Sequence, residues 1–223
     1  MDKNKANTSQ ARVLFQGDSI TDAGRKYQEP DDLGLGYPYF AAETASTKYP
    51  GKFKYINRGV GGNRSIDLLA RVKADIINLK PDYMSILIGV NDVWHEFDEA
   101  NPNGVDNEKY KLYYRMLLQQ VKEALPEIKI VIMEPYVLKG TDTEGYYEEF
   151  RSEVELRAKS ARELAEEFNL PFIPMQEKLD KAFEEKPIGY WTLAGDGVHP
   201  TTEGHKLIAS LWMEEFDKFA ADK

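Results

Sequence analysis

The order of apolar segments along the chain most constrains how it can fold. Short runs that are almost wholly apolar alternate with longer segments in which apolar side chains recur at helical spacing. Runs without a polar face are typical of strands in a parallel sheet that helices cover on both faces. They predict five strands, at residues 12–16, 54–57, 83–88, 129–133 and 171–173.

The longer segments predict the helices that join these strands. They are expected at about residues 38–48, 66–79, 108–124, 146–168 and 202–220. Strands that alternate with helices imply right-handed crossovers, so the predicted fold class is α/β, a three-layer α/β/α sandwich around a parallel sheet. The last helix carries an apolar stripe that indicates packing against the core: Leu207, Ile208, Leu211, Trp212, Phe216 and Phe219.

One domain is the expected organisation. No stretch is rich enough in proline and serine, or repetitive enough, to be a linker, and 223 residues suit a single large domain. We therefore expect a polar N-terminal extension over residues 1–10 and one domain over residues 11–223.

Charge and apolar content bear on partners and location. A net charge of −9 would repel phosphates, so we expect no nucleic acid partner. No apolar run approaches the roughly 20 residues of a membrane-spanning helix, and the first ten residues lack the apolar centre of a signal peptide. These features predict a cytoplasmic protein without a membrane partner. A secreted or periplasmic form from which a signal peptide has been removed is the alternative.

The absence of cysteine narrows the chemistry of any site. The chain can form no disulfide, thiolate nucleophile or cysteine-based zinc site, so a nucleophile must carry oxygen or nitrogen. In parallel α/β sheets, sites form beyond the carboxyl ends of the strands. The loops at the ends of the first three strands read GDS at 17–19, RGVGGNRS at 58–65 and GVND at 89–92. We expect these loops to lie side by side.

Ser19 is a candidate nucleophile, and it would need a base to remove its proton. Of the three histidines, His199 is the strongest candidate, because Pro200 disfavours a helical conformation there and Asp196 lies three residues earlier. On a compact turn this spacing lets the carboxylate reach Nδ1 and leaves Nε2 free, although a bare D-x-x-H pair is a weak signal. His205, inside the last helix, is expected to cap or pack. For His95, substrate contact and surface exposure both stay open.

An ester-cleaving serine also needs N–H donors for the oxyanion of the tetrahedral intermediate. The glycine pair at 61–62 can bring a backbone N–H close, Asn91 offers a side-chain amide, and the N–H of Ser19 is a third candidate. The structural alternatives are a tight turn for the glycines and a helix cap for Asn91. The G-x-S-x-G pattern of α/β-hydrolases is absent around Ser19, which argues against that fold.

With these residues together, the sequence resembles the SGNH hydrolases, also called the GDSL esterase family. The matching blocks are GDSITD, NRGVGGN, GVND and DGVHP, and they span nearly the whole domain. The resemblance implies a flavodoxin-like α/β/α fold, with Ser19 as nucleophile, His199 as base and Asp196 as its orienting acid. It also implies an oxyanion hole formed by Ser19, Gly62 and Asn91. No metal or organic cofactor is expected. The choice of Gly62 over its neighbours Gly59 and Gly61 rests on alignment of the motif.

Within that family, GDSITDAGR, LGLGYPYF and GVNDVW look closest to bacterial acetyl xylan esterases and related carbohydrate acetylesterases. The resemblance implies a small-molecule acylated carbohydrate as substrate, with acetylated xylo-oligosaccharides favoured. Trp94, Tyr190 and Trp191 are candidate sugar contacts, with core packing as the alternative. Asp18 is a further candidate contact, although we expect it to brace the turn through backbone hydrogen bonds.

Other functions and assemblies stay open at this point. One rival is a lysophospholipase or thioesterase for longer acyl chains, against which the sequence shows no strongly apolar lid or surface helix. Another is a non-catalytic carbohydrate-binding domain, which would have no need of His199 and Asp196 together. A homo-oligomer is also possible on this sequence.

Overall fold

The computed structural model describes residues 10–221, and its centre is a parallel β-sheet. The strands follow the order β2-β1-β3-β4-β5, and each of them pairs in parallel with its neighbours. This confirms the predicted strands and the predicted sheet. Apart from Gln10, the predicted extension over residues 1–10 lies outside the described residues. The strands are β1 Ala11–Gly17, β2 Phe53–Asn57, β3 Tyr83–Leu87, β4 Lys129–Met133 and β5 Phe172–Ile173.

Side chains of each strand alternate between two apolar clusters, one on each face of the sheet. Val13 and Phe15 belong to one cluster, and Leu14 between them belongs to the other. In the neighbouring strand, Tyr83 and Met84 divide in the same way. Both faces are therefore buried, which explains why the strands read as nearly continuous apolar runs.

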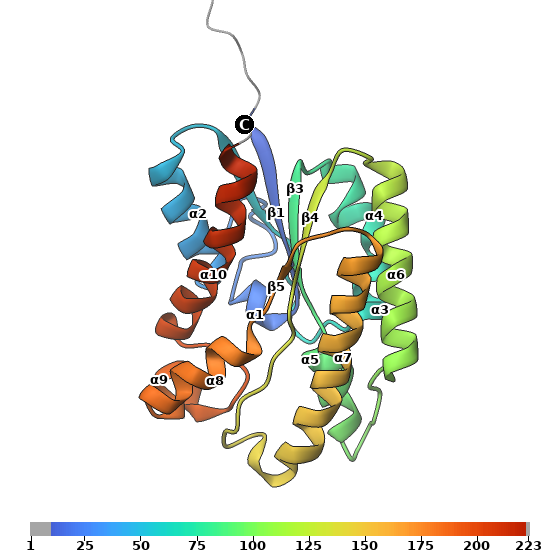
Figure 1. Cartoon of the computed structure of the whole chain (residues 1–223), viewed down its shortest axis with the longest axis vertical. Coiled ribbons are helices and arrows are strands. Elements are labelled where there is room, and N and C mark those ends of the chain that lie inside the picture. The colour runs from blue at the N-terminus through green and yellow to red at the C-terminus, as the bar shows by residue number, and fades with distance from the viewer. Residues whose placement is uncertain (1–9, 222–223) are drawn as a thin grey trace, which may run out of the picture.

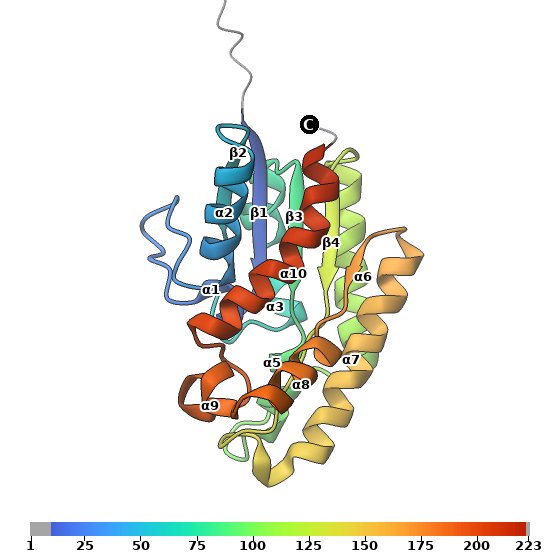
Figure 2. The same cartoon turned by 60° about the vertical axis from the view of Figure 1, so that its left-hand side comes forward.

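Helices cover both faces and form the outer layers. Figures 1 and 2 show α2 and α10 on one side of the sheet, and α3, α4, α6 and α7 on the other. The arrangement is the predicted three-layer α/β/α sandwich. Among residues 10–221, none of the helices combines the length and the apolar character that crossing a membrane requires. The main helices are α2 Tyr37–Lys48, α3 Ser65–Ala70, α6 Asn107–Ala124, α7 Tyr147–Glu167 and α10 Thr202–Ala221.

The helix predicted over residues 66–79 is wrong in one respect, because the segment is broken. It consists of α3, α4 (Val72–Asp75) and a 3₁₀ turn, Ile77–Leu79. Arg71 leaves the helical conformation at the first break, with φ −106° and ψ 11°. Its guanidinium donates to Asn63 Oδ1 at 2.8 Å and to the carbonyl oxygens of Arg58 and Gly17, so tertiary acceptors hold the arginine at the break.

Several short helices occupy segments where the sequence predicts loops. Figures 1 and 2 place α1, α5, α8 and α9 at the end of the molecule to which the strands' carboxyl ends point. α1 begins two residues after β1 ends, and α5 begins three residues after β3 ends. Their bounds are α1 Ser19–Asp22, α5 Val90–Trp94, α8 Gln176–Glu185 and α9 Ile188–Trp191, with further 3₁₀ turns at His95–Phe97, Glu144–Tyr146 and Leu193–Gly195.

Candidate active site

Ser19 is presented by a sharp turn between β1 and α1. Gly17 ends the strand where a Cβ would collide with the Leu87 carbonyl oxygen and with the Thr21 side chain. Asp18 is buried, and its Oδ1 accepts a hydrogen bond from Ile20 N at 2.9 Å, which caps the helix. Ser19 is the first residue of α1, so its hydroxyl emerges at the carboxyl edge of the sheet. Asp18 braces the turn as expected and does not line the pocket beside Ser19.

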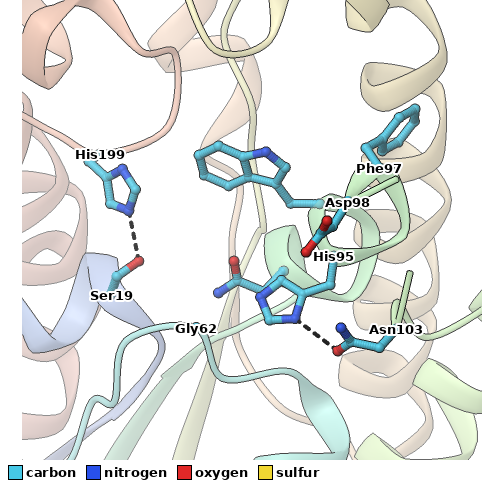
Figure 3. Close-up of a pocket in the computed structure, with 9 residues that line it drawn as sticks. Ser19, Gly62, His95, Phe97, Asp98, Asn103 and His199 are labelled. Carbon is cyan, nitrogen blue, oxygen red and sulfur yellow. Dashed lines mark hydrogen bonds between the residues drawn. The ribbon is translucent and has the colours of Figure 1, made fainter. Parts of the chain in front are cut away.

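A histidine and an aspartate from the other end of the chain meet this hydroxyl. Ser19 Oγ lies 3.0 Å from His199 Nε2, and His199 Nδ1 lies 2.7 Å from Asp196 Oδ2 (Figure 3 shows the Ser19–His199 contact). The other carboxylate oxygen of Asp196 accepts the backbone N–H groups of Val198 and His199. Because a carboxylate only accepts, Nδ1 carries the proton in the neutral ring and Nε2 is left to accept from the serine.

Electrostatics favour a proton on this histidine. The hydrogen bond that His199 Nδ1 donates to Asp196 raises the pKa of His199 above its usual value of 6.5, although partial burial of the ring opposes the shift. A raised pKa makes the imidazole a stronger base towards the serine hydroxyl. The arrangement can therefore activate Ser19 and later return the proton to a leaving group.

The loop that carries His199 is held by the segment that follows β4. Tyr136 Oη donates to Val198 O at 2.9 Å, and Leu138 N donates to Gly197 O at 2.8 Å. Gly197 has φ +92° and packs so closely on Leu138 that a side chain would clash. Tyr136 lies three residues after β4, and its position just beyond a strand end is the sequence feature that indicates a place at the site.

Gly62 is the glycine of its loop that faces the pocket. Gly59 N donates to Asn57 Oδ1 at 2.8 Å and Gly61 N donates to Asp22 Oδ2 at 3.0 Å, so both N–H groups are engaged inside the protein. Gly62 has φ +74° and occupies the third position of a turn closed by Asn63 N and Val60 O. Gly62 can thus be part of a tight turn and still offer its N–H as an oxyanion donor. The geometry favours Gly62 over Gly59 and Gly61 for that role.

Asn91 lies in α5, and it lines the same pocket as Gly62. Its Nδ2 donates to Asn63 O at 3.1 Å, which orients the amide and leaves its second N–H for another acceptor. The next residue, Asp92, is fully buried and accepts from both the N–H and the hydroxyl of Ser65. Burial raises the pKa of Asp92 to about 7. This contact joins the helix of Asn91 to the end of the Gly62 loop.

Two carboxylates therefore hold the Gly62 loop, one at Gly61 and the other at Ser65. Asp22 comes from the helix of Ser19 and Asp92 from the helix of Asn91. The sequence analysis predicted neither of these roles, nor the contact of Ser65 with Asp92. The available signal was their position within the motifs, since GDSITD ends at Asp22 and GVND ends at Asp92.

A pocket of about 450 Å³ opens beside Ser19. Trp94 forms part of its wall, with its ring centroid 5.8 Å from that of His199, and its indole N–H donates to Tyr146 Oη at 3.1 Å. The predicted sugar contacts Tyr190 and Trp191 lie in α9 and do not line this pocket, so their role stays a prediction. The lining residues are Ser19, Gly62, Asn91, Trp94, His95, Phe97, Asp98, Asn103 and His199.

The other two histidines differ in position. His205 is buried and its Nδ1 accepts from Tyr37 N at 3.1 Å, so it joins α10 to α2 as a packing residue. Burial lowers its pKa to about 4. His95 lines the pocket and its ring lies against Gly62. Among residues 10–221, no group of three or more imidazoles and carboxylates is arranged to bind a metal ion.

Comparison with known proteins places these motifs in a family. The sequence model of the GDSL-like lipase/acylhydrolase family matches residues 15–207. An acetylxylan esterase from Geobacillus stearothermophilus is 32% identical over 212 residues, which are 92% of this chain and 93% of that protein. The crystal structure of an acetylxylan esterase from the same organism has a TM-score of 0.81 at 30% identity, with 92% of this chain and 93% of that chain covered. A structure from Parabacteroides merdae described as a GDSL-like lipase has a TM-score of 0.84 at 39% identity, with 92% and 94% covered.

Proposed function

The chain belongs to the GDSL-like lipase/acylhydrolase family and is a carboxylic ester hydrolase, and on this premise we propose that it deacetylates carbohydrates. The substrates are O-acetyl esters such as acetylated xylo-oligosaccharides, and the reaction proceeds through an acyl-enzyme on Ser19. The observation that carries the proposal is the continuous contact from Ser19 Oγ through His199 to Asp196 at the edge of a pocket.

The first half of the reaction transfers the acetyl group to the serine. His199 Nε2 takes the proton of Ser19 Oγ as the oxygen attacks the ester carbonyl. The negative charge that develops on the carbonyl oxygen is stabilised by the N–H groups of Ser19 and Gly62 and by the Asn91 amide. The carbon–oxygen bond to the sugar then breaks, and the sugar oxygen leaves with the proton from His199.

The second half returns the enzyme to its starting state. Water attacks the acetyl-serine while His199 accepts a proton from it, and the same donors hold the second oxyanion. Collapse of this intermediate breaks the bond to Ser19 Oγ, which regains its proton from His199. Acetic acid is released. Asp196 keeps the imidazole in one tautomer and stabilises the imidazolium in both halves.

Two observations favour a short acyl group on a sugar over a long acyl chain. Relatives include the acetylxylan esterase of Geobacillus stearothermophilus, and a variant of it is described as an acetyl-xylooligosaccharide esterase. The lining of the pocket also includes the polar side chains of Asp98, His95 and Asn103. An octanoyl chain would have to lie against these groups, whereas a sugar can hydrogen bond to them.

Acetate release from a panel of acetylated xylo-oligosaccharides tests the proposal, with acetyl and octanoyl esters of one alcohol compared in parallel. We expect sugar acetates to be cleaved and the octanoyl ester to be a poor substrate. A clear preference for octanoyl would instead support the lysophospholipase or thioesterase alternative. A fluorophosphonate probe should label Ser19, because labelling requires an activated serine. Failure to label the native protein would favour a non-catalytic carbohydrate-binding domain.

A further inference from the structure

A chain of hydrogen bonds fixes the orientation of a histidine that the mechanism above does not use. Asn103 Oδ1 lies 3.3 Å from His95 Nδ1 and accepts from Arg64 Nη1 at 2.8 Å. Figure 3 shows the contact between His95 and Asn103 across the pocket from Ser19 and His199. Arg64 is itself held by Asp67, and Asn103 N donates to His95 O at 3.0 Å. Side chain and backbone thus both tie His95 to Asn103.

These contacts determine which nitrogen of His95 carries the proton in the neutral ring. The amide of Asn103 is oriented, because its Nδ2 donates to Asn101 O at 2.8 Å and its Oδ1 accepts from Arg64. Oδ1 has no proton to give, so Nδ1 of His95 must be the donor in their contact. In the neutral imidazole the other nitrogen, Nε2, is then a hydrogen-bond acceptor.

The acceptor lies next to the candidate oxyanion donors but cannot assist them. A Cβ on Gly62 would lie 3.9 Å from His95 Nε2, so the imidazole borders the glycine that lines the pocket beside Ser19. A lone pair would repel the oxyanion, whereas it attracts a hydroxyl proton. The complementary group for His95 Nε2 is therefore an O–H donor on the substrate.

The size of the pocket indicates which part of the substrate supplies that donor. An acetyl group fills a small part of about 450 Å³, so most of the space receives the alcohol portion of the ester. Trp94 and Phe97 provide apolar walls, and both are fixed by contacts to Tyr146. Aromatic walls beside an acceptor of fixed direction suit the ring of a sugar that carries a free hydroxyl.

We propose that His95 is a specificity-determining residue whose Nε2 accepts a hydrogen bond from a free hydroxyl next to the acetylated position of the sugar. Asn103 and Arg64 are positioning residues that hold the ring in the accepting tautomer. This inference rests on the proposed deacetylation of carbohydrates, and it names the substrates preferred at the same site: partly acetylated sugars that keep a neighbouring hydroxyl.

The test compares two substrates that differ in one oxygen. One is a xylose monoacetate with a free hydroxyl on the carbon next to the ester, and the other has that hydroxyl replaced by hydrogen. In alkaline buffer, which favours neutral imidazole, the wild-type enzyme should prefer the hydroxyl-bearing ester about 10-fold in kcat/KM. His95→Phe keeps a planar ring without an acceptor, so the ratio of the two rates should fall towards one. Glu99→Gln, at an exposed position outside the pocket, is the matched control and should keep the wild-type ratio.

A second measurement examines the tautomer directly. In a ¹⁵N–¹H correlation spectrum, His95 of the wild-type protein should show a protonated Nδ1 and an unprotonated Nε2. Asn103→Leu removes the oxygen that accepts from His95 Nδ1. The population of the Nε2–H tautomer should then rise, and the preference for the hydroxyl-bearing ester should fall with it. An Nε2–H tautomer in the wild-type protein would overturn the inference.

The outcomes separate the two proposals. Equal rates on the two esters, or a ratio that survives His95→Phe, would overturn the role of His95 while leaving deacetylation of carbohydrates intact. If neither ester released acetate, the proposed function would fail and the inference would fail with it.

Discussion

The two sides of the pocket are built differently. On one side, Ser19, His199 and Asp196 contact one another directly, at 3.0 Å and 2.7 Å. On the other side, Gly62 and Asn91 are placed by groups behind them, namely Asp22, Asp92 and the backbone of the intervening loop. We call Ser19, His199 and Asp196 the relay, and we call Gly62 and Asn91 the donor side.

This difference teaches where mutations should act. In the relay, each group is both a chemical participant and the support of its neighbour, so a single truncation removes a step of the reaction. On the donor side, the supporting residues lie behind the groups that face the pocket, so their loss should misplace a donor without removing it. The loss of kcat should therefore be largest for mutations in the relay, smaller for mutations of the donors, and smallest for mutations of the residues that support the donors.

The largest effect is expected for Ser19→Ala. Without the hydroxyl no acyl-enzyme forms, and kcat on an acetyl ester should fall by about 10⁵-fold or more. Thermal unfolding should barely change, because the hydroxyl makes one hydrogen bond, to His199. Ser210→Ala is the control, since that serine is exposed on α10. Near wild-type turnover by the Ser19 variant would show that Ser19 is not the nucleophile.

Asp196→Asn tests the relay through its pH dependence. Activity requires neutral His199, so it should fall as the pH drops through the pKa of that ring, which Asp196 raises above 6.5. Loss of the carboxylate charge lowers this pKa, so the acidic limb of the kcat/KM profile should move to lower pH. The amide also favours the wrong tautomer, and kcat should fall by about 10³- to 10⁴-fold. An acidic limb that stays in place would mean that the titrating group is not His199.

Asn91→Ala tests the donor side. Removal of one oxyanion donor should lower kcat by about 10²- to 10³-fold with a much smaller change in KM, because the donor acts on charge that develops in the transition state. Steady-state kinetics on an acetyl ester separates the two parameters. A rise in KM at constant kcat would assign Asn91 to substrate binding and would remove it from the oxyanion hole.

Much of the fold could be predicted because its determinants are local. Strands buried on both faces are largely apolar, and short apolar runs located all five. The break at Arg71 could not be predicted in the same way. Its guanidinium is held by acceptors on Asn63, Arg58 and Gly17, which the sheet brings together from different parts of the sequence.

The same distinction applies to the site. Asp196 and His199 are three residues apart on one turn, and Ser19 follows a strand end, so spacing and topology were enough to propose them. Ser65 and Asp92 are 27 residues apart, and their contact depends on how neighbouring loops pack. Hydrophobic periodicity carries no signal for such a pair, because each residue alone is an ordinary polar residue near a helix start.

Asp22→Asn is the most sensitive test of the comparison, because it alters a support and leaves the chemical identity of every group that faces the pocket unchanged. Asp22 Oδ2 accepts from Gly61 N at 3.0 Å and from Tyr27 Oη. An amide NH₂ in that position cannot accept from Gly61, so the turn should shift and Gly62 N–H should lose its alignment. A misplacement of this kind should lower kcat by about 10-fold with little change in KM. Tyr27→Phe removes the phenol and keeps the Gly61 contact, so its effect should be smaller. Equal losses in the two variants would mean that the carboxylate acts through Tyr27, and no loss in either would mean that Gly62 needs no support from the helix of Ser19.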